Sequence, residues 1–278
     1  MAENKLDEII RVSLVTDRAD EDITTGLVVD KGLECSAVIL ARQEGIISGQ
    51  EYAARVFSFV DDHIDYAVSI ADGEKAKPSD TVAEVTGRAA SVMAGERTAL
   101  NFLGHFSGIA TMTSLFVDRL RGSGITVLDT RKTTPGLRIA EKKAVRDGGG
   151  GNHRMNLADY ILVKENHIAA AGSLANVIRR LGERLREAEI EVDSMDMLVN
   201  VLKDPPGRIM LDNFNPGMVA EAAARIDGLG ENRPELEVSG GITLDNVESY
   251  ALPGVDYISV GSLTASSPAL DLSLILKC

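Results

Sequence analysis

The chain has few cysteines. Among its 278 residues only Cys35 and Cys278 carry a thiol, and neither belongs to a CxxC or CxxH motif. Two distant cysteines exclude a disulfide framework and give no support to a zinc site. We interpret Cys35 as a small buried apolar residue and Cys278 as a loose terminal thiol.

Positive charge is also scarce. The sequence has 29 lysines and arginines against 42 aspartates and glutamates, which gives a formal net charge of −13. An acidic protein repels a phosphate backbone unless its cations are gathered on one face. We therefore expect no nucleic-acid partner.

Long apolar runs are missing as well. No run approaches the roughly 20 apolar residues that a helix needs to cross a bilayer. The first residues lack the basic and apolar regions of a signal peptide. Hydrophobic residues make up 44% and charged residues 26% of the chain, an ordinary composition for a folded domain. We expect a cytoplasmic enzyme or binding protein with no membrane partner.

One segment departs from this acidic background. The stretch from Leu128 to His167 is dense in cations, histidines and glycines, and its two strongest clusters follow short apolar runs. Cations at the ends of strands indicate an anion site. The segment contains Arg131, Lys132, Arg138, His153, Arg154, Lys164 and His167.

The second half of the chain alternates short β-branched runs with segments of helical periodicity, such as the one that follows the expected N-cap Ser173. This alternation predicts a parallel sheet. Because nearly every expected strand ends in a polar group, we favour a β/α barrel, complete or incomplete, over an open sheet with one switch point. The expected strands are Ile125 to Leu128, Tyr160 to Val163, Ile190 to Val192, Ile209 to Leu211, Leu236 to Val238 and Tyr257 to Val260.

The first hundred residues predict a separate α+β domain, with several strands ahead of a helix from Glu96 to about Arg121. The alternating segment that begins at Asp271 is expected to form a strand that returns to this domain. We place the N-terminal sandwich domain at residues 1–105, joined by the tail 266–278, and the catalytic barrel at 106–265.

Nine short motifs resemble, in order, those of the quinolinate phosphoribosyltransferase family, also called carboxylating nicotinate-nucleotide pyrophosphorylases. The resemblance covers nearly the whole chain. It implies an α/β fold in which an α+β sandwich domain packs on an incomplete barrel of about six parallel strands. It also implies a homodimer, or a higher homo-oligomer, with shared active sites. The motifs are EDITT from Glu21, ERTALNFLGHFSGIAT from Glu96, LDTRKTTPGLR from Leu128, GGGGNHR from Gly148, ILVKENHI from Ile161, EIEVDS from Glu189, IMLDNF from Ile209, VSGGIT from Val238 and ISVGSLT from Ile258.

The activity implied by this resemblance is a step of de novo NAD synthesis. Quinolinate and phosphoribosyl pyrophosphate would give nicotinate mononucleotide, pyrophosphate and carbon dioxide. Quinolinate carries two adjacent carboxylates, which call for several fixed donors and preferably guanidinium groups. The natural candidates are Arg131, His153, Arg154 and Lys164. The resemblance places these four around quinolinate and adds Arg97 from the partner subunit.

Carboxylates are expected at the ribose and the metal. Glu189, Glu191 and Asp193 alternate, so they share one face of a strand, and Mg²⁺ prefers oxygen ligands. The resemblance assigns Glu191 and Asp212 to Mg²⁺ and the ribose, and Lys132 to the pyrophosphate. The expected catalytic residues are thus Lys132, Lys164, Glu191 and Asp212.

The 5-phosphate is expected on glycine-rich turns after the last strands, because glycine lets backbone N–H groups approach an anion and a helix start adds a favourable dipole. The residues are Ser239, Gly240 and Gly241, ahead of a helix expected near Thr243, with Gly261 and Ser262. The run Gly148 to Gly151 lacks the end of a phosphate-binding P-loop, so we interpret it as a turn that presents His153 and Arg154.

Three alternatives stay open. A branch that resembles the same family is associated with molybdenum transport and would share the fold. A non-catalytic phosphate-binding barrel could act as a sensor. A sugar-phosphate aldolase or isomerase could form a Schiff base on Lys164.

Overall fold

The computed structural model describes residues 2–277 and divides into two compact units. The first unit combines residues 2–114, 134–149 and 266–277, and the second combines 115–133 and 150–265. The domain boundaries proposed from the sequence, at 105/106 and 265/266, stay predictions.

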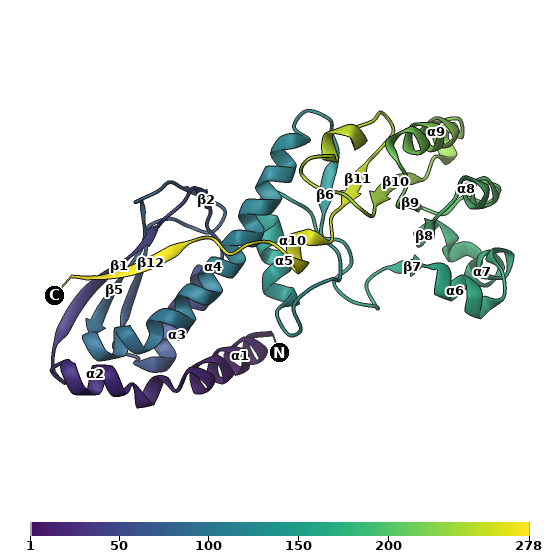
Figure 1. Ribbon diagram of the computed structural model, residues 1–278. Coiled ribbons are helices and arrows are strands. Elements are labelled where there is room, and N and C mark those ends of the chain that lie inside the picture. The colour runs from purple at the N-terminus through teal and green to yellow at the C-terminus, as the bar shows by residue number, and fades with distance from the viewer. Residues whose placement is uncertain (1, 278) are drawn as a thin grey trace. The chain divides into compact units, whose positions relative to one another are not determined.

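The first unit contains a four-stranded antiparallel sheet in the order β12-β1-β5-β3 (Figure 1). Its strands are β1 (Glu34–Ala41), β3 (Asp65–Val68), β5 (Thr81–Arg88) and β12 (Leu272–Lys277), beside the small pair β2 (Gly45–Ile46) and β4 (Lys75–Ala76). The expected return of the C-terminal segment is confirmed, because β12 pairs with β1. Cys35 is buried, as predicted, and Cys278 lies outside the described residues.

Helices complete this unit. They are α1 (Ala2–Asp17), α2 (Ile23–Val28), α3 (Gln50–Val60), the first part of α4 (Ala89–Arg119) and α5 (Arg138–Asp147), with the 3₁₀ turn η1 (Ala19–Glu21). Length and composition alone would allow α4 to cross a membrane, but 61% of its most apolar window is buried inside the protein. Leu103, Phe106 and Ile109 on α4 are at most 1% exposed. We therefore assign α4 to the protein core.

The second unit contains a six-stranded parallel sheet in the order β6-β11-β10-β9-β8-β7. Among the described strands β6 and β7 do not pair with each other, so the barrel is incomplete, which confirms the predicted architecture. The strands are β6 (Thr126–Leu128), β7 (Ile161–Val163), β8 (Ala188–Val192), β9 (Arg208–Asp212), β10 (Glu235–Ser239) and β11 (Tyr257–Ser259).

Helices lie outside this sheet, as Figure 1 shows for α7, α8 and α9. They are α6 (Glu165–Ala171), α7 (Leu174–Leu181), α8 (Met195–Val201), α9 (Pro216–Asp227) and α10 (Ser262–Ala265), with the 3₁₀ turns η2 (Gly182–Glu187), η3 (Gly230–Asn232) and η4 (Val247–Tyr250). The predicted cap of α7 is confirmed, since Ser173 Oγ accepts from the N–H of Asn176 at 3.2 Å.

Strand register determines which side chains share the inner face of this sheet. Glu189 pairs with Arg208, and Arg208 pairs with Glu235. Two residues further along, Met210 pairs with Glu191 and with Glu237. Side chains alternate between the two faces of a strand, so residues two positions apart on a strand point to the same face. The row Glu189, Arg208 and Glu235 therefore shares a face with the row Glu191, Met210 and Glu237. The last such row, at the carboxyl ends of the strands, holds Asp212, Ser239 and Ser259.

Candidate active site

A cavity of about 420 Å³ opens at the carboxyl ends of the parallel strands, within the second unit. It brings together most of the side chains that the sequence predicted for the site. Its lining is Thr130, Arg131, Lys132, His153, Arg154, Leu162, Lys164, Glu191, Met210, Asp212, Ser239 and Ser259.

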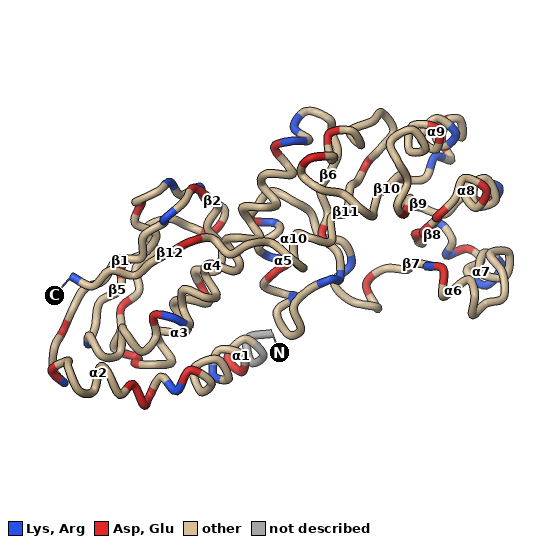
Figure 2. Tube along the Cα trace, viewed as in Figure 1, with Lys and Arg blue, Asp and Glu red and all other residues tan. Residues whose placement is uncertain are grey.

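The loop after β6 supplies two of the cations. Arg131 and Lys132 are both exposed, and Figure 2 marks this loop and the end of β7 in blue. A hydrogen bond from a side chain holds the loop, since the Thr264 hydroxyl donates to the Lys132 carbonyl at 2.7 Å. A Cβ added to Gly261 would lie 3.0 Å from Lys132 Cδ, so the glycine lets the lysine stem pass close to the backbone. Lys132 and Gly261, both predicted for the site, are therefore neighbours.

The segment that begins at Gly151, the last glycine of the run, lies beside β6. The N–H of Gly151 donates to the Val127 carbonyl at 2.7 Å, and an added Cβ on Gly151 would lie 2.9 Å from Leu128 Cδ2. Buried Asp129 accepts from the N–H of His153 at 2.9 Å and from Asn152 Nδ2 at 2.6 Å. Close packing at Gly151 and these bonds to Asp129 place His153 and the following residue at the cavity.

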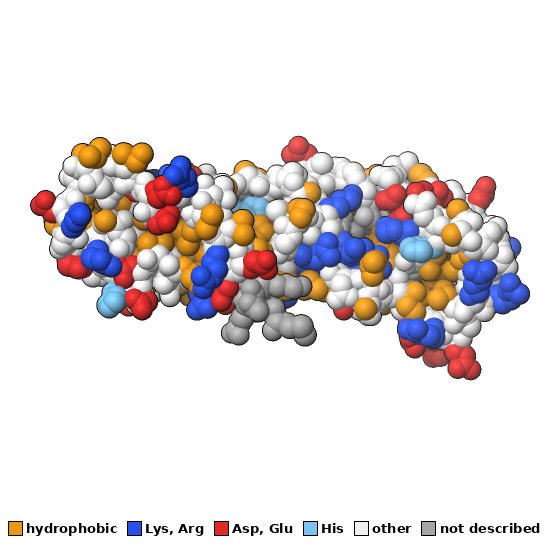
Figure 3. All heavy atoms as spheres, turned by 90° about the horizontal axis from the view of Figure 1, so that it is seen from below, with side chains coloured by type: hydrophobic (Ala, Val, Ile, Leu, Met, Phe, Trp, Pro, Cys, Tyr) orange, Lys and Arg blue, Asp and Glu red, His pale blue; other side chains and the backbone are white. Residues whose placement is uncertain are grey.

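Arg154 is half-buried, and its guanidinium donates to the Tyr160 carbonyl at 3.4 Å. Burial and the positive charge of Arg131 lower the pKa of Arg154. Two guanidinium groups that repel each other at one wall are stabilised by an anion placed between them. The geometry thus favours a negatively charged ligand. On the face drawn in Figure 3, Lys and Arg side chains gather in one stretch of this acidic protein.

Lys164 follows β7 and forms an ion pair with Glu191, which lies on β8. The backbone N–H of Lys164 donates to His167 Nδ1 at 2.9 Å, which caps the start of α6. His167 is exposed and does not line the cavity, so the structure places it beside the site at a helix cap.

The glycine turn after β10 differs from the prediction. Gly240 and Gly241 have φ angles of 88° and 65°, values that suit glycine. No α-helix begins near Thr243 in the described chain, so that prediction was wrong. The Asn246 side chain accepts from the N–H of Thr243 at 2.8 Å and donates to the Gly241 carbonyl at 2.9 Å, and these bonds hold the turn before η4. The segment forms a turn that leads to η4, and a helix dipole is not available there.

Ser239 lines the cavity, Gly240 follows it in the chain and Gly261 lies against Lys132, whereas Gly241 and Ser262 are not among the lining residues. An added Cβ on Gly240 would meet Asn213 Oδ1 at 2.4 Å, so the turn packs tightly against the end of β9. Ser262 begins the four-residue helix α10 after β11.

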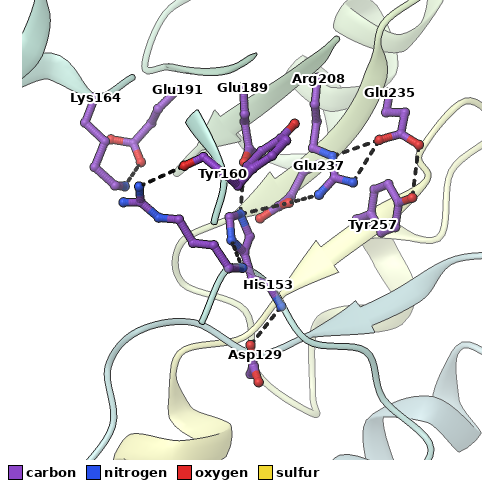
Figure 4. A network of polar contacts seen from close by, with 11 residues as sticks. Asp129, His153, Tyr160, Lys164, Glu189, Glu191, Arg208, Glu235, Glu237 and Tyr257 are labelled. Atoms are coloured by element: carbon purple, nitrogen blue, oxygen red, sulfur yellow. Dashed lines mark hydrogen bonds and ion pairs between the residues drawn. The ribbon is translucent and has the colours of Figure 1, made fainter. Parts of the chain in front are cut away.

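A buried charged layer lies beneath the cavity and was largely missed from the sequence. Glu189, which the sequence placed only on the same strand face as Glu191, and Glu237 are fully buried, and Figure 4 shows both pointing toward His153. Arg208 stacks on Tyr257, with its guanidinium carbon 3.9 Å from the ring centroid, and donates to Glu237 at 3.3 Å. Burial raises the pKa of both glutamates well above the usual range. The run ELEVS from Glu235 alternates acidic and apolar residues, as the run EIEV from Glu189 does. This alternation is the sequence signal from which the buried layer could have been predicted.

Arg97 is not part of this lining. It is exposed on α4 in the first unit and lines a cavity of about 530 Å³ within that unit. His105 lines the same cavity, and its Nε2 lies 2.9 Å from the fully buried carboxylate of Glu141.

Comparisons with known proteins agree with this geometry. Residues 22–107 match the family model of the quinolinate phosphoribosyl transferase N-terminal domain, and residues 109–275 match that of its C-terminal domain.

Two curated relatives and one solved structure are similar over most of the chain. A Mycobacterium leprae protein named nicotinate-nucleotide pyrophosphorylase (carboxylating) is 40% identical, over 91% of this chain and 90% of that protein. A Nicotiana glauca protein named quinolinate phosphoribosyltransferase (decarboxylating) 1 is 37% identical, over 96% of this chain and 81% of that protein. The structure of the Francisella tularensis nicotinate-nucleotide pyrophosphorylase superposes with a TM-score of 0.91 at 36% identity, covering 99% and 96% of the two chains. The chain therefore belongs to the quinolinate phosphoribosyl transferase family.

Proposed function

We propose that this protein transfers the phosphoribosyl group of phosphoribosyl pyrophosphate to quinolinate and releases carbon dioxide, pyrophosphate and nicotinate mononucleotide. One observation carries the proposal: a single cavity at the strand ends combines Arg131, Lys132, Arg154 and Lys164 with the carboxylates of Glu191 and Asp212. Cations suit the dicarboxylate ring, and carboxylates suit a sugar that becomes positively charged.

The quinolinate end of the cavity is assigned to Arg131, His153, Arg154 and Lys164. Arg131 and Arg154 can each grip a carboxylate with two parallel hydrogen bonds. Lys164 already neutralises Glu191, so its ammonium group lies between the two ends of the site. Arg97 is the fifth quinolinate residue of the proposal and would come from a second subunit.

The phosphoribosyl pyrophosphate end is assigned to Lys132, to the turn Ser239, Gly240 and Gly241, and to Gly261 and Ser262. Lys132 acts as a point charge for the pyrophosphate. The positive φ values of Gly240 and Gly241 present backbone groups that a side chain would otherwise cover.

Mg²⁺ is the proposed cofactor, held by Glu191 and Asp212. Both residues line the cavity and offer hard oxygen ligands, and Asp212 is half-buried with the Asn213 amide as its hydrogen-bond donor at 2.8 Å. This donor set fits Mg²⁺. The chemistry that the bound ion supplies is neutralisation of the charge on the leaving pyrophosphate.

The reaction needs no protein nucleophile. The bond between ribose C1 and the pyrophosphate oxygen breaks with its electron pair on the oxygen, while the quinolinate nitrogen forms the new bond to C1. Arg131 and Arg154 orient the ring, and the carboxylates near the ribose stabilise the positive charge that develops there. The positively charged ring nitrogen then accepts the electron pair of the adjacent carboxylate bond as carbon dioxide leaves. A proton replaces carbon dioxide on the ring.

The proposed assembly is a homodimer, or a higher homo-oligomer, in the cytoplasm. Support comes from exposed apolar side chains on α1 and α2, among them Val15, Ile23 and Leu27, which are 74–80% exposed. Surfaces of this kind often bind another chain. Arg97 belongs to the first unit and does not line this cavity, and the proposal is that it serves the site of a partner subunit.

The test is incubation with phosphoribosyl pyrophosphate and Mg²⁺ plus either quinolinate or nicotinate, followed by measurement of carbon dioxide and mononucleotide. Turnover with quinolinate alone is expected. Turnover with nicotinate alone, or with neither compound, would contradict the proposal.

A further inference from the structure

The ring of His153 is held from below by two buried acids. Its Nε2 lies 2.9 Å from Glu189 Oε2 and 3.7 Å from Glu237 Oε2, and the side chain is only 6% exposed (Figure 4). Glu189 comes from β8 and Glu237 from β10, so two strands on either side of β9 hold one ring.

The other ring nitrogen is engaged as well. The backbone N–H of Arg154 donates to His153 Nδ1 at 2.7 Å. A nitrogen that accepts this bond carries no proton, so the proton of the imidazole is on Nε2 and is donated to Glu189. The hydrogen bond to Glu189 therefore favours the same tautomer, in which the lone pair of Nδ1 binds the Arg154 amide.

Glu237 stabilises this arrangement from the side. Arg208 Nη1 donates to Glu237 Oε2 at 3.3 Å, and the same guanidinium binds the exposed Glu235 at 2.8 Å. The Arg208 guanidinium thus brings positive charge to a layer with two buried carboxyl groups. A carboxylate that is completely buried beneath a ligand cavity and aimed at a lining side chain is well placed to orient that side chain.

We propose that Glu189, supported by Glu237, is a positioning residue for quinolinate: it holds the His153 ring so that His153 Nδ1 fixes the Arg154 backbone at the cavity wall. This inference rests on the proposed function, because it assigns Arg154 to the quinolinate carboxylates. Neither glutamate lines the cavity, so both act through other residues.

The experiment compares Glu189→Leu, Glu189→Gln and the control Glu235→Gln in the full-length protein. Leucine removes the acceptor for Nε2, so the KM for quinolinate should rise about tenfold or more while the KM for phosphoribosyl pyrophosphate stays near wild type. Glutamine keeps an acceptor oxygen and should restore most of the loss. Glu235→Gln changes a partner of Arg208 that does not contact His153, and should leave the KM for quinolinate unchanged.

A second measurement does not depend on turnover. The ¹⁵N shifts of the imidazoles can be assigned among only four histidines, and they report the tautomer of His153. The Nε2–H form should dominate in wild type and in Glu189→Gln, and should be lost in Glu189→Leu.

The outcomes separate the two proposals. An active wild type combined with a normal quinolinate KM in folded Glu189→Leu, or with an unchanged tautomer in that variant, overturns the positioning role alone. A wild-type protein without quinolinate turnover overturns the proposed function. If Glu189→Leu does not fold, the Glu237→Leu variant takes its place, and an unchanged quinolinate KM there also overturns the role.

Discussion

Lys164 and Glu191 form an ion pair across the carboxyl ends of β7 and β8. The pair joins a cation assigned to quinolinate with a carboxylate assigned to Mg²⁺ and the ribose, so a change in either residue should affect both ends of the cavity.

For Lys164→Ala we expect kcat/KM for quinolinate to fall by about 10- to 100-fold, because the loss of one charged hydrogen-bond donor costs this much. The affinity for Mg²⁺ should rise, since Glu191 would lose its competing cation. Steady-state kinetics and a Mg²⁺ titration measure both effects. Lys203→Ala, at an exposed lysine that contacts Asn200, is the control. Wild-type kinetics in Lys164→Ala would remove this residue from the site.

Arg131→Ala should abolish turnover without loss of the fold. Arg131 is exposed at the cavity, so its removal creates no void in the core, whereas quinolinate loses a guanidinium group. A quinolinate assay measures the loss of turnover, and a thermal melt measures whether the fold is retained. Arg121→Ala, in the exposed pair with Asp118, is the matched arginine control. Near-wild-type activity would contradict a role in binding.

Asp212→Asn should raise the concentrations of Mg²⁺ and of phosphoribosyl pyrophosphate that are needed for half-maximal rate. The amide keeps the size of the side chain but lacks the charge that a hard cation prefers. Asp193→Asn is the comparison, because Asp193 is exposed after β8 and does not line the cavity. Unchanged requirements for both compounds in Asp212→Asn would count against the metal assignment.

Mixed dimers test the assignment of Arg97. The variants Arg97→Ala and Lys132→Ala should each be inactive alone. A heterodimer of the two would contain one intact site, since the barrel with Lys132 would receive Arg97 from the other subunit. Activity should therefore return after the subunits are exchanged. No recovery in verified heterodimers would be incompatible with a shared site.

Asp61 provides a prediction about stability. It accepts hydrogen bonds from the Ser91 hydroxyl at 2.8 Å, the N–H of His63 at 3.1 Å and Arg88 at 2.6 Å, and these bonds hold its pKa well below the usual range. A lowered pKa means that the folded protein binds this proton more weakly than the unfolded chain. The stabilisation is therefore complete at neutral pH and is lost as the pH falls below the ordinary aspartate value.

Asp61→Asn should accordingly lower the Tm at pH 7, and the difference from wild type should shrink in acid. Thermal melts between pH 3 and 8 measure the difference directly. Asp62→Asn is the control, because the Asp62 side chain is 85% exposed. A Tm difference that does not depend on pH would mean that Asp61 contributes through shape alone.

The strand ends were predictable from the sequence. Arg131, Lys164 and Asp212 each follow a short apolar run, and parallel strands bring their carboxyl ends to one edge. The structure brings these residues to one cavity, although each run was too short to place its residue alone.

The layer beneath the cavity was harder to predict. Charged side chains are rarely buried, so the sequence alone favours exposed positions for Arg208 and Glu237. Strand register places both residues on the inner face of the sheet. The turn at Thr243 was missed for a different reason, since the motif indicates where a helix could start but not its type or length, and only the 3₁₀ turn Val247–Tyr250 forms there. Which subunit's active site Arg97 serves depends on how the chains assemble. Neither hydrophobic periodicity nor motif spacing contains that information.

The pairing of β12 with β1 has a consequence for biosynthesis. On the ribosome, the sheet of the first unit has an open edge at β1 until Leu272–Lys277 has emerged, by which time all of the second unit has been made. An open strand edge invites pairing with another nascent chain. This sheet can therefore be completed only late in synthesis. Pairing of the open β1 edge with another chain during translation should lower the yield of active protein.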